Sequence, residues 1–451
     1  MRLSLLPPLL LLAATACVPL GTPITDPNAA RRPATPGQQA ATEYYADKTL
    51  RYQDYTYDPN VRTVQCYVAT GQPNEVFNPP VVPITQEAPV MLEFDVLGGQ
   101  GGRLTAKLVH CDVNWQPSVL TDLQFLDEIN EQLITDYRAS VNTRVPYFHY
   151  RLRLPRVKLS GNYLWVVQGP GGTPLLSRRV LVYEQGGVEV FLKQGIPVAG
   201  QERYTLQQLD FGIRYAGMQL VNPAQEVKVV LRQNFRWDNA KVNLRPTFVR
   251  DAERRLDYQY FNFENAFPAL SEFRFVDLRT FRSLGVGVAR LNPEATPRQA
   301  ELQPEATRLG QAYTQYDDIN GQRVIESRDF VGNGNTTADY LSVTFHLRAS
   351  EAAPGPVYVL GALSDWQLKD EFRLTYDAAT QEYTGQALLK QGYYNYYYAT
   401  QTPQGPNSVV WEGSYQETEN QYDLLVYYRP PGSRADLLIG YQRLDVNQRR
   451  P

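Results

Sequence analysis

Hydrophobic and polar residues alternate in short runs along most of the chain. Between residues 64 and 183 the clearest runs are 90–96, 104–109, 147–154 and 163–167, and glycine-rich turns such as 98–102 and 169–172 separate them. Alternation with a period of two predicts strands with one buried and one solvated face. The spacing of these runs and turns is typical of an antiparallel β-sandwich.

One segment in this region has a different period. Between residues 118 and 137, apolar residues recur near helical spacing with acidic residues between them: Leu120, Leu123, Leu126, Ile129 and Leu133. This pattern predicts an amphipathic helix inserted in the first sandwich, with its apolar stripe on the sandwich. A helix that binds a partner is the alternative.

The alternating pattern continues in two further units. Strand-like runs at 207–213 and 227–234 lie in one unit, and runs at 341–347, 357–361 and 393–400 lie in another, after a polar segment at 291–311 and a glycine turn at 332–335. We therefore predict an all-β fold of tandem immunoglobulin-like or early-set antiparallel β-sandwiches, with the one inserted helix in the first. The expected boundaries are 61–185, 186–335 and 336–451.

The first 16 residues have the features of an export signal. One arginine precedes a short apolar run and small residues, and the run is too short to span a membrane. Ala14-Thr15-Ala16-Cys17 resembles a bacterial lipobox, which predicts a lipid on Cys17 after cleavage. An ordinary cleaved signal with an incidental cysteine is the alternative.

A tether is expected between this cysteine and the folded body. Residues 18 to about 45 are rich in Pro, Ala and Thr and lack apolar periodicity, so they cannot bury enough surface to fold, and we expect the tether over residues 17–60. In surface-exported lipoproteins of the Bacteroidetes type, acidic residues follow the lipidated cysteine, and Val18-Pro19-Leu20-Gly21 has none. This favours an outer-membrane lipoprotein that faces the periplasm.

Composition excludes several functions. The 451 residues include 44 Lys and Arg against 47 Asp and Glu, a net charge of −3, so no basic field favours nucleic acid. The only histidines are His110, His149 and His346, and no two are close enough in sequence to ligate a metal from one element. We expect no metal and no cofactor.

Catalytic motifs are also missing from the sequence. No nucleophile elbow, Walker loop or dinucleotide loop occurs. His110 and His149 with Asp112 form a conceivable acid–base set, but their strand-like surroundings favour structural histidines. We predict no enzymatic activity. Cys66 and Cys111 are either a disulfide or two buried thiols, and the sequence leaves both open.

Several unusual motifs recur in a characteristic order. The runs are 110–118, 140–150, 159–163, 207–211, 233–238 and 272–277, and together they resemble the type IX secretion system plug protein family over about residues 60–445. Leu270-Ser271 departs from the Gly-Asn that the family carries at this point. The family motif residues in the first unit are His110, Cys111, Asp112, Trp115, Asn142, Thr143, Gly161, Asn162 and Tyr163.

The resemblance implies a binding role without catalysis. Plug proteins of this system bind and close the periplasmic mouth of the outer-membrane translocon β-barrel, so that barrel is the expected partner, with the membrane contacted through the lipid anchor only. Aromatic and arginine residues commonly anchor such interfaces. The candidates for partner binding are Trp115, Trp237, Phe273 and Arg274.

The last unit suggests a second function. Its run from Val357 to Trp366, with Trp411 and the tyrosines of 393–398, is similar to early-set sandwiches that include glycogen-binding modules. A cell-envelope carbohydrate-binding module is therefore the alternative. An exposed row of aromatic rings would favour glycan, whereas buried rings and an exposed apolar patch elsewhere would favour a protein partner.

Overall fold

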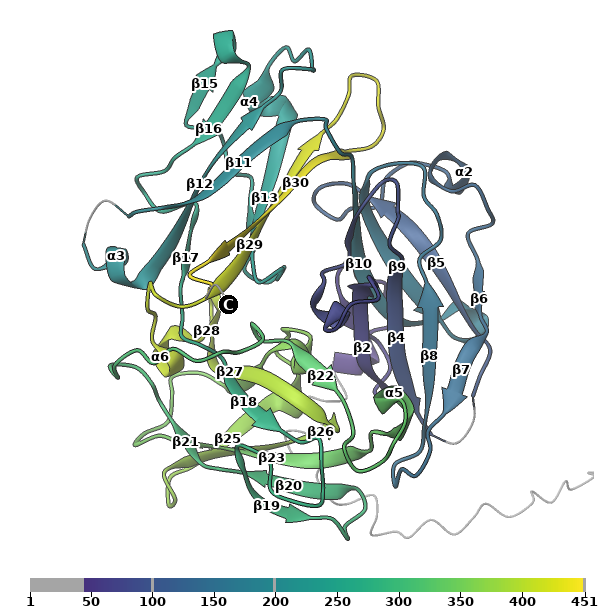
Figure 1. Cartoon of the computed structure of the whole chain (residues 1–451), viewed down its shortest axis with the longest axis vertical. Coiled ribbons are helices and arrows are strands. Elements are labelled where there is room, and N and C mark those ends of the chain that lie inside the picture. Colours follow the sequence, from purple (N-terminus) through teal and green to yellow (C-terminus); the bar gives the residue numbers. More distant parts are fainter. Residues whose placement is uncertain (1–43, 99–100, 198–199, 449–451) are drawn as a thin grey trace, which may run out of the picture.

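Three β-sandwiches meet in the computed structural model, which describes residues 44–98, 101–197 and 200–448 (Figure 1). The predicted all-β sandwich fold is confirmed, because most described elements are strands, and most neighbouring strands pair antiparallel. Cys17, the predicted signal peptide and residues 17–43 of the predicted tether lie outside the described residues. The tether prediction is wrong for its last part, because β1 (Tyr55–Thr56) pairs with β10 (Pro174–Tyr183) and Tyr57 is fully buried. Within the described ranges, no helix has the length and apolarity needed to cross a membrane.

The first sandwich contains two sheets that enclose one core. Trp165, Leu92 and Phe94 lie fully buried between them. One sheet has the order β1 (Tyr55–Thr56), β10 (Pro174–Tyr183), β9 (Gly161–Gln168), β5 (Leu104–Cys111), β6 (Gln132–Ile134), with β3 (Val81–Pro83) beside β10. The other has the order β2 (Val61–Val68), β4 (Val90–Leu97), β8 (Tyr147–Arg153), β7 (Asp136–Ala139).

The helix predicted for residues 118–137 is wrong except for one turn. Only α2 (Asp122–Phe125) is helical, and the chain then forms the edge strands β6 and β7. Phe125, Leu126 and Ile134 point into the core, whereas Leu123 and Ile129 are exposed. Backbone pairing of β6 with β5 therefore overrides the helical spacing of the apolar residues.

The second sandwich is completed by the last strands of the chain. Its core contains Phe211, Leu231 and Tyr258 together with Tyr422 and Leu424. One sheet has the order β11 (Glu189–Gly195), β12 (Leu206–Arg214), β16 (Arg255–Tyr258), β15 (Phe248–Arg250), with β17 (Ala266–Pro268) beside β12. The other has the order β14 (Lys241–Val242), β13 (Val227–Gln233), β29 (Asn420–Tyr428), β30 (Leu437–Val446).

The third sandwich is inserted between β17 and β29. A single 11-stranded sheet folds over its own core, which includes Val343, Val359 and Tyr398. The order is β18 (Arg274–Asp277), β27 (Gly392–Thr402), β24 (Val357–Leu360), β25 (Arg373–Asp377), β26 (Glu382–Lys390), β23 (Tyr340–Arg348), β20 (Arg298–Leu302), β19 (Val288–Asn292), with β21 (Glu305–Ala306) beside β23, and β22 (Arg323–Ile325) and β28 (Gly405–Asn407) beside β27.

Strand pairing therefore differs from a simple linear division of the chain. The sequence placed residues 186–335 in the second unit and 336–451 in the third. In the structure β18, β20 and β22 pair within the third sandwich, and β29 pairs with β13 of the second from Tyr428 opposite Val227 to Tyr422 opposite Gln233. Short alternating runs mark strands but carry no information about which strands pair.

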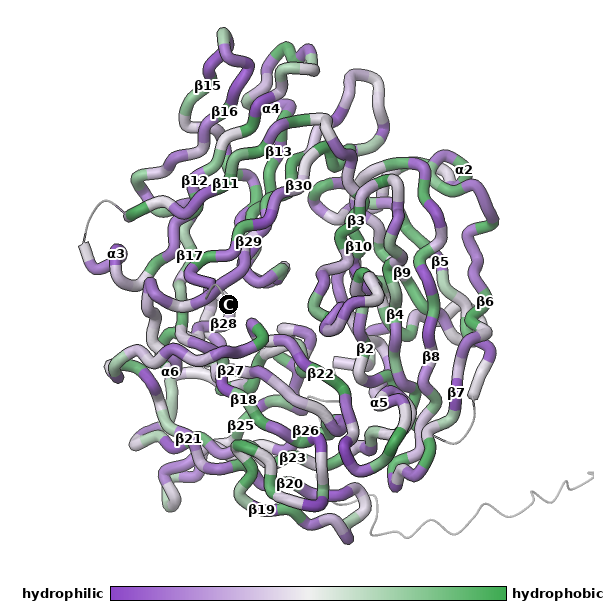
Figure 2. Tube along the Cα trace, in the orientation of Figure 1, coloured by the Kyte–Doolittle hydropathy of each residue, from purple (hydrophilic) through white to green (hydrophobic). Residues whose placement is uncertain are grey.

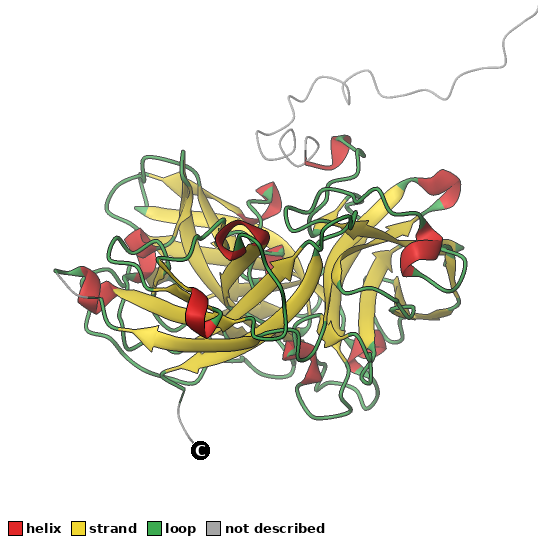
Figure 3. Ribbon diagram, turned by 90° about the horizontal axis from the view of Figure 1, so that it is seen from above, coloured by secondary structure: helices red, strands yellow, loops and turns green. Residues whose placement is uncertain are grey.

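Helices are short and lie between strands (Figure 3). Other α-helical turns are residues 44–46, α3 (Glu202–Thr205), α4 (Pro223–Glu226), α5 (Gly334–Thr337) and α6 (Val409–Glu412). The 3-10 turns are η2 (Glu75–Phe77), η3 (Pro170–Gly172), η4 (Asp251–Glu253), η5 (Ala362–Ser364) and η6 (Asp370–Phe372).

A buried ion pair joins the first sandwich to the third. Lys390 Nζ of β26 lies 2.6 Å from Asp95 Oδ2 of β4, and both side chains are 1% exposed. The Tyr340 hydroxyl donates to the same carboxylate at 2.7 Å, and the Lys390 ammonium lies 4.1 Å from the centre of the Tyr147 ring. Each charged group in this cluster is paired with an opposite charge or accepts or donates a hydrogen bond. Charged groups can be buried between domains only when they are compensated in this way.

Two of the histidines are buried in opposite electrostatic environments. Burial alone would lower the pKa of His149, but hydrogen bonds to Asp95, 2.8 Å from Nδ1, and to Glu93 raise it above its usual value. His110 has no hydrogen-bond partner for either ring nitrogen among the described residues. Burial therefore lowers the pKa of His110 to about 4.

Removing one partner of the buried pair should destabilise the fold. We expect Lys390→Met to lower the free energy of unfolding by about 3–5 kcal/mol, because it leaves the Asp95 carboxylate buried without its ammonium. Adding Asp95→Asn should recover part of this loss. Urea unfolding of the two single variants and the double variant measures the coupling, with the exposed Lys193→Met as control. Strictly additive losses would contradict a coupled pair.

The two histidines should show opposite pH dependence. His149 has a raised folded-state pKa, so its stabilisation is complete below its unfolded pKa of about 6.5 and is lost as pH rises through the folded value. His110 has a lowered folded-state pKa. Its contribution to the free energy of unfolding is therefore present above a pH of about 6.5, the unfolded pKa, and is lost as the pH falls from there toward the folded value of about 4.

The destabilisation by His149→Gln should therefore shrink between pH 6 and pH 8.5, whereas that by His110→Gln should grow. Urea unfolding of each variant and the unsubstituted protein at both pH values measures the two trends. Parallel trends for the two variants would show that these environments are assigned incorrectly.

Candidate functional site

The first sandwich meets the second through the end of β5 and the start of β9. Cys111 pairs with Asn162, and His110 with Tyr163, so two of the sequence motifs lie side by side. After β5 the chain makes a tight turn in which Asp112 Oδ1 accepts the backbone N–H groups of Asn114 and Gln116, each at 2.9 Å. The motif residues thus shape one end of the sandwich.

This end is hydrogen-bonded to the last strands of the chain. The fully buried Asn162 accepts a 2.8 Å hydrogen bond from the Tyr427 hydroxyl and donates to the Asp112 carbonyl at 2.9 Å. The Val113 N–H donates to Asp436 Oδ2 at 3.1 Å. Around these bonds, Leu164 and Val166 pack on Leu425 and Leu438. The interface is an apolar patch with satisfied polar groups at its edge.

The remaining motif residues have local structural roles. Gly161 has φ of +141°, and a Cβ at this position would lie 2.7 Å from His110 Nε2. Only glycine therefore fits beside the imidazole. Tyr163 is fully buried and donates to the Leu159 carbonyl at 2.7 Å.

The turn before β8 faces the third sandwich. Asn142 takes a left-handed conformation, and the Thr143 hydroxyl donates to Ser140 Oγ at 2.7 Å. This turn aims the Arg144 N–H at Asp339 Oδ2, at 2.9 Å. The motif residues of the first sandwich therefore contribute to contacts with both other sandwiches.

Trp115 and Trp237 come together at the first interface. Their rings are perpendicular with centroids 5.1 Å apart, and the Arg179 guanidinium lies 4.8 and 5.0 Å from the two rings. Trp115 is buried and Trp237 is half-buried. Both side chains are therefore engaged within the chain, between its first two sandwiches.

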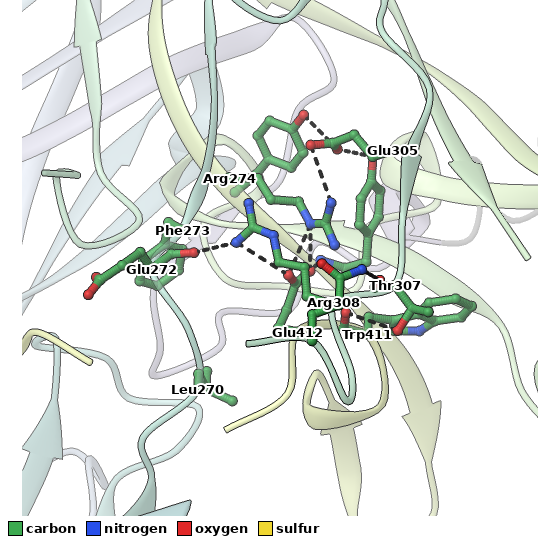
Figure 4. A network of polar contacts seen from close by, with 12 residues as sticks. Leu270, Glu272, Phe273, Arg274, Glu305, Thr307, Arg308, Trp411 and Glu412 are labelled. Carbon is green, nitrogen blue, oxygen red and sulfur yellow. Dashed lines mark hydrogen bonds and ion pairs between the residues drawn. The ribbon is translucent and has the colours of Figure 1, made fainter. Parts of the chain in front are cut away.

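Phe273 and Arg274 lie elsewhere, where the chain enters the third sandwich (Figure 4). Arg274 Nε donates to Glu412 Oε1 at 2.9 Å, and its Nη1 lies 3.3 Å from Glu305. Phe273 packs on Tyr397. Both residues are buried, and the two carboxylates raise the pKa of the Arg274 guanidinium despite its burial.

The four predicted partner-binding residues thus form two separate clusters, and neither cluster presents a free aromatic or arginine side chain. Aromatic and arginine residues anchor internal domain interfaces for the same reasons that they anchor contacts between proteins, so residue type alone did not distinguish the two.

A cavity of about 170 Å³ lies where all three sandwiches meet. Four arginines and two aspartates line it, together with apolar side chains such as Val64 and Trp366. From the first sandwich come Arg178, Arg179 and Asp54, from the second Arg232, and from the third Arg323 and Asp365. The arginines are far apart in sequence, so no motif could have indicated this cluster.

Two of the four arginines have a carboxylate partner. Arg178 Nη2 lies 3.0 Å from Asp365, and Arg232 Nε lies 2.9 Å from Asp423. Arg179 and Arg323 instead donate to backbone carbonyls, of Tyr52 at 2.9 Å and of Val64 at 2.6 Å. Burial lowers the pKa of Arg179, the nearby Asp54 carboxylate partly opposes this, and the charge of Arg232 adds to the lowering.

A second surface feature lies on the outer side of the first sandwich, away from the other two (Figure 2). We call it the outer edge: the exposed side chains of Val119, Leu123, Ile129, Leu133 and Tyr137, on α2, β6, β7 and the loops around them. Ile129 is 86% exposed and Leu123 is 74% exposed. A hollow of about 270 Å³ adjoins Ile129 and is lined by Leu126 and Pro155. Large exposed apolar side chains on one side of a domain are candidates for an interaction surface.

The aromatic residues of the third sandwich form no exposed row. Tyr394, Tyr396 and Tyr398 are in its core, and Tyr397 packs on Phe273. Trp411 is buried and its Nε1 donates to Thr400 at 2.9 Å. The tyrosines and the tryptophan that the carbohydrate alternative needs as an exposed row are therefore engaged in packing inside the third sandwich.

The histidine and cysteine side chains, which could serve in metal binding or redox chemistry, do not form one cluster among the described residues. In the parts of the chain that the structure describes, no group of three or more His, Cys, Asp or Glu side chains is arranged to hold a metal ion. Cys66 and Cys111 are free thiols, and burial raises the pKa of Cys111 to about 12. His110 and His149 lie in separate environments, with Asp112 occupied in its turn.

Comparison with known proteins gives two informative matches. Residues 61–184 match the family described as type 9 secretion system plug protein 1st domain. A crystal structure of a hypothetical protein from Parabacteroides merdae has a TM-score of 0.82 and 27% identity, and the match covers 88% of this chain and 100% of that one. No curated protein matches at a significant level.

The family match includes the first sandwich from β2 to the residue after β10, with the motif residues and the outer edge. The solved structure extends the similarity in fold over most of the chain. The matched family is a secretion-system plug domain and not an enzyme family. The match of this domain indicates a role in type IX secretion and a location in the cell envelope. Residues 61–184, which form most of the first sandwich, therefore match the first domain of the type IX secretion system plug proteins.

Proposed function

We propose that this protein binds the periplasmic mouth of the outer-membrane translocon barrel of the type IX secretion system and closes it, without catalysis. The observation that carries the proposal is the joining of the three sandwiches through buried polar contacts. A stopper for a protein-sized pore has to resist deformation, because a loosely linked chain of domains would leave gaps.

Each pair of sandwiches has its own buried attachment. Asp95 and Lys390 join the first to the third, and Asn162 and Tyr427 join the first to the second. Between the second and third, the Arg236 guanidinium lies 4.2 Å from the centre of the Trp366 ring. Separating any two sandwiches would expose apolar surface and break these contacts. The three sandwiches would therefore move together as one rigid unit.

The outer edge is the surface that we assign to the barrel. It lies within residues 61–184, the part that matches the plug family, and its elements α2, β6 and β7 are on the side of the first sandwich away from the other two (Figure 1). Apolar side chains flanked by charged ones, such as Glu128 and Glu131 around Ile129, have the composition of an interface core with a polar rim. A stable closure would need an interface of about 1,600 Å², so the edge serves as the centre of a larger contact.

The lipid on Cys17 and the tether complete the proposal. A lipidated, periplasm-facing protein on a tether of at most 27 residues (17–43) remains close to the outer membrane, which raises its effective concentration at the barrel. The membrane is contacted only through the lipid.

The general test is purification of the tagged full-length protein in mild detergent with identification of the proteins that co-elute. We expect the translocon barrel. Deletion of the gene should make cells leaky to large hydrophilic antibiotics when the barrel is otherwise unoccupied. Unchanged permeability together with no barrel in the eluate would refute the plug function.

Charge placed on the outer edge should weaken the complex. We expect Leu123→Asp combined with Ile129→Asp to reduce recovery of the barrel at least tenfold, because each aspartate would have to be desolvated at the centre of the interface. The melting temperature should remain within about 2 °C, because both side chains are exposed. Val221→Asp is the matched control, since Val221 is exposed on the second sandwich. An equal loss of barrel in the control would remove the outer edge from the proposal.

Substitution of Cys17 should separate anchoring from folding. Cys17→Ser should shift the mature protein from the membrane fraction to the soluble fraction, because three acyl chains bind a bilayer far more strongly than the marginal binding of one. Fractionation after osmotic lysis and mass spectrometry of the N-terminal peptide measure this. If the unsubstituted protein were already soluble, the lipid anchor would be refuted and the outer edge would remain testable.

A further inference from the structure

The cavity between the three sandwiches has a net positive charge, because its arginine side chains outnumber its carboxylates. Its lining contains Arg178, Arg179, Arg232 and Arg323 against Asp54 and Asp365. Asp423 lies behind Arg232 and neutralises it, and Asp365 is shared between Arg178 and Lys369, 2.7 Å away. Among the described residues, Arg179 and Arg323 therefore lack an ion-pair partner of their own.

Unpaired buried guanidinium groups are costly. Moving a cation out of water costs several kcal/mol unless an opposite charge compensates for it. Arg179 Nε is inaccessible to solvent and has no hydrogen-bond partner among the described residues. The same guanidinium is held in place by the Trp115 and Trp237 rings and by the Tyr52 carbonyl. Its position is therefore fixed while part of its hydrogen-bonding capacity is unused.

The loops around the cavity adopt unusual backbone conformations. Asn234 and Phe235 follow β13 with φ of 51° and 57°, and Asp365 and Trp366 follow η5 with φ of 54° and 58°. Left-handed backbone costs energy for residues other than glycine, and two consecutive instances in each of two converging loops indicate that the loops are shaped for a purpose. Phe235, Asp365 and Trp366 all line the cavity.

The space suits a small anionic group. A cavity of about 150 Å³ in another protein holds a benzene molecule, so the present cavity can hold a phosphate or a carboxylate with a few further atoms. Guanidinium groups bind such oxyanions through paired N–H donors. The apolar walls, with Val64 and Trp366 among them, would exclude water and strengthen the attraction.

We propose that the junction of the three sandwiches is a binding site for one oxyanion, a phosphate or a carboxylate, and that Arg179 and Arg323 are its principal ligands. Because the lining comes from all three sandwiches, the bound anion stabilises their mutual arrangement. This site is independent of the plug function, since the isolated protein would bind the anion without any barrel.

Titration calorimetry of the whole protein tests the site, with inorganic phosphate and with acetate as probes at constant ionic strength set by sodium chloride. We expect at least one probe to bind and to raise the melting temperature by about 1–3 °C at saturation. Binding of phosphate alone would identify a phosphate site, and binding of acetate would identify a carboxylate site. Absence of both binding and stabilisation would overturn the proposal.

Two variants with opposite effects separate binding from folding. Arg179→Met should abolish binding of the probe, whereas Asp54→Asn should tighten it by on the order of tenfold, because a repelling charge is removed. The asparagine still accepts the Arg179 N–H through Oδ1, the atom that Asp54 uses at 2.7 Å. Arg138→Met, on the exposed strand β7, is the control and should leave the affinity unchanged. Unchanged affinity in both cavity variants would place the anion elsewhere.

Discussion

The pairing of β13 with β29 is the contact on which the rest of the architecture depends. These strands lie on either side of the inserted third sandwich, yet they are adjacent in one sheet of the second. Only when they pair does that sheet present Tyr427 and Leu438 to the first sandwich and fix where the third is held. Bringing such distant segments together costs loop-closure entropy, and the large apolar core around Tyr422 compensates for it.

Much of the local structure could be predicted from the alternation of apolar and polar residues. The runs at 90–96, 104–109 and 227–234 became β4, β5 and β13 almost within their expected limits. Residues 118–137 failed because Leu120, Leu123 and Leu126 have helical spacing by coincidence, while the neighbouring edge of β5 offers unpaired backbone groups. The domain boundaries in the second half also differed, because a strand's pattern shows its faces and not its partner.

The candidate sites illustrate a different limit. The family motifs around His110 and Asn162 could be found in the sequence, and the structure brings them together at one end of the first sandwich. The cavity arginines could not be found, because Arg179, Arg232 and Arg323 lie in three sandwiches and each looks like an ordinary strand or loop residue. The exposed outer edge was hidden by the helix prediction, which assigned the same leucines to a buried stripe. Both features required the three-dimensional arrangement.

The strands β29 and β30 complete the second sandwich only after the third has been synthesised, and this order affects an incompletely synthesised chain. A chain synthesised only as far as residue 419 would contain a complete third sandwich but would leave β13 as an exposed edge, with Val229 and Leu231 uncovered. Unpaired apolar edges recruit strands from other molecules and are recognised by chaperones and proteases. A chain that lacks β29 and β30 cannot cover the edge of β13 and is therefore a target for degradation. Folding of the carboxyl-terminal strands thus distinguishes a complete chain from an incomplete one.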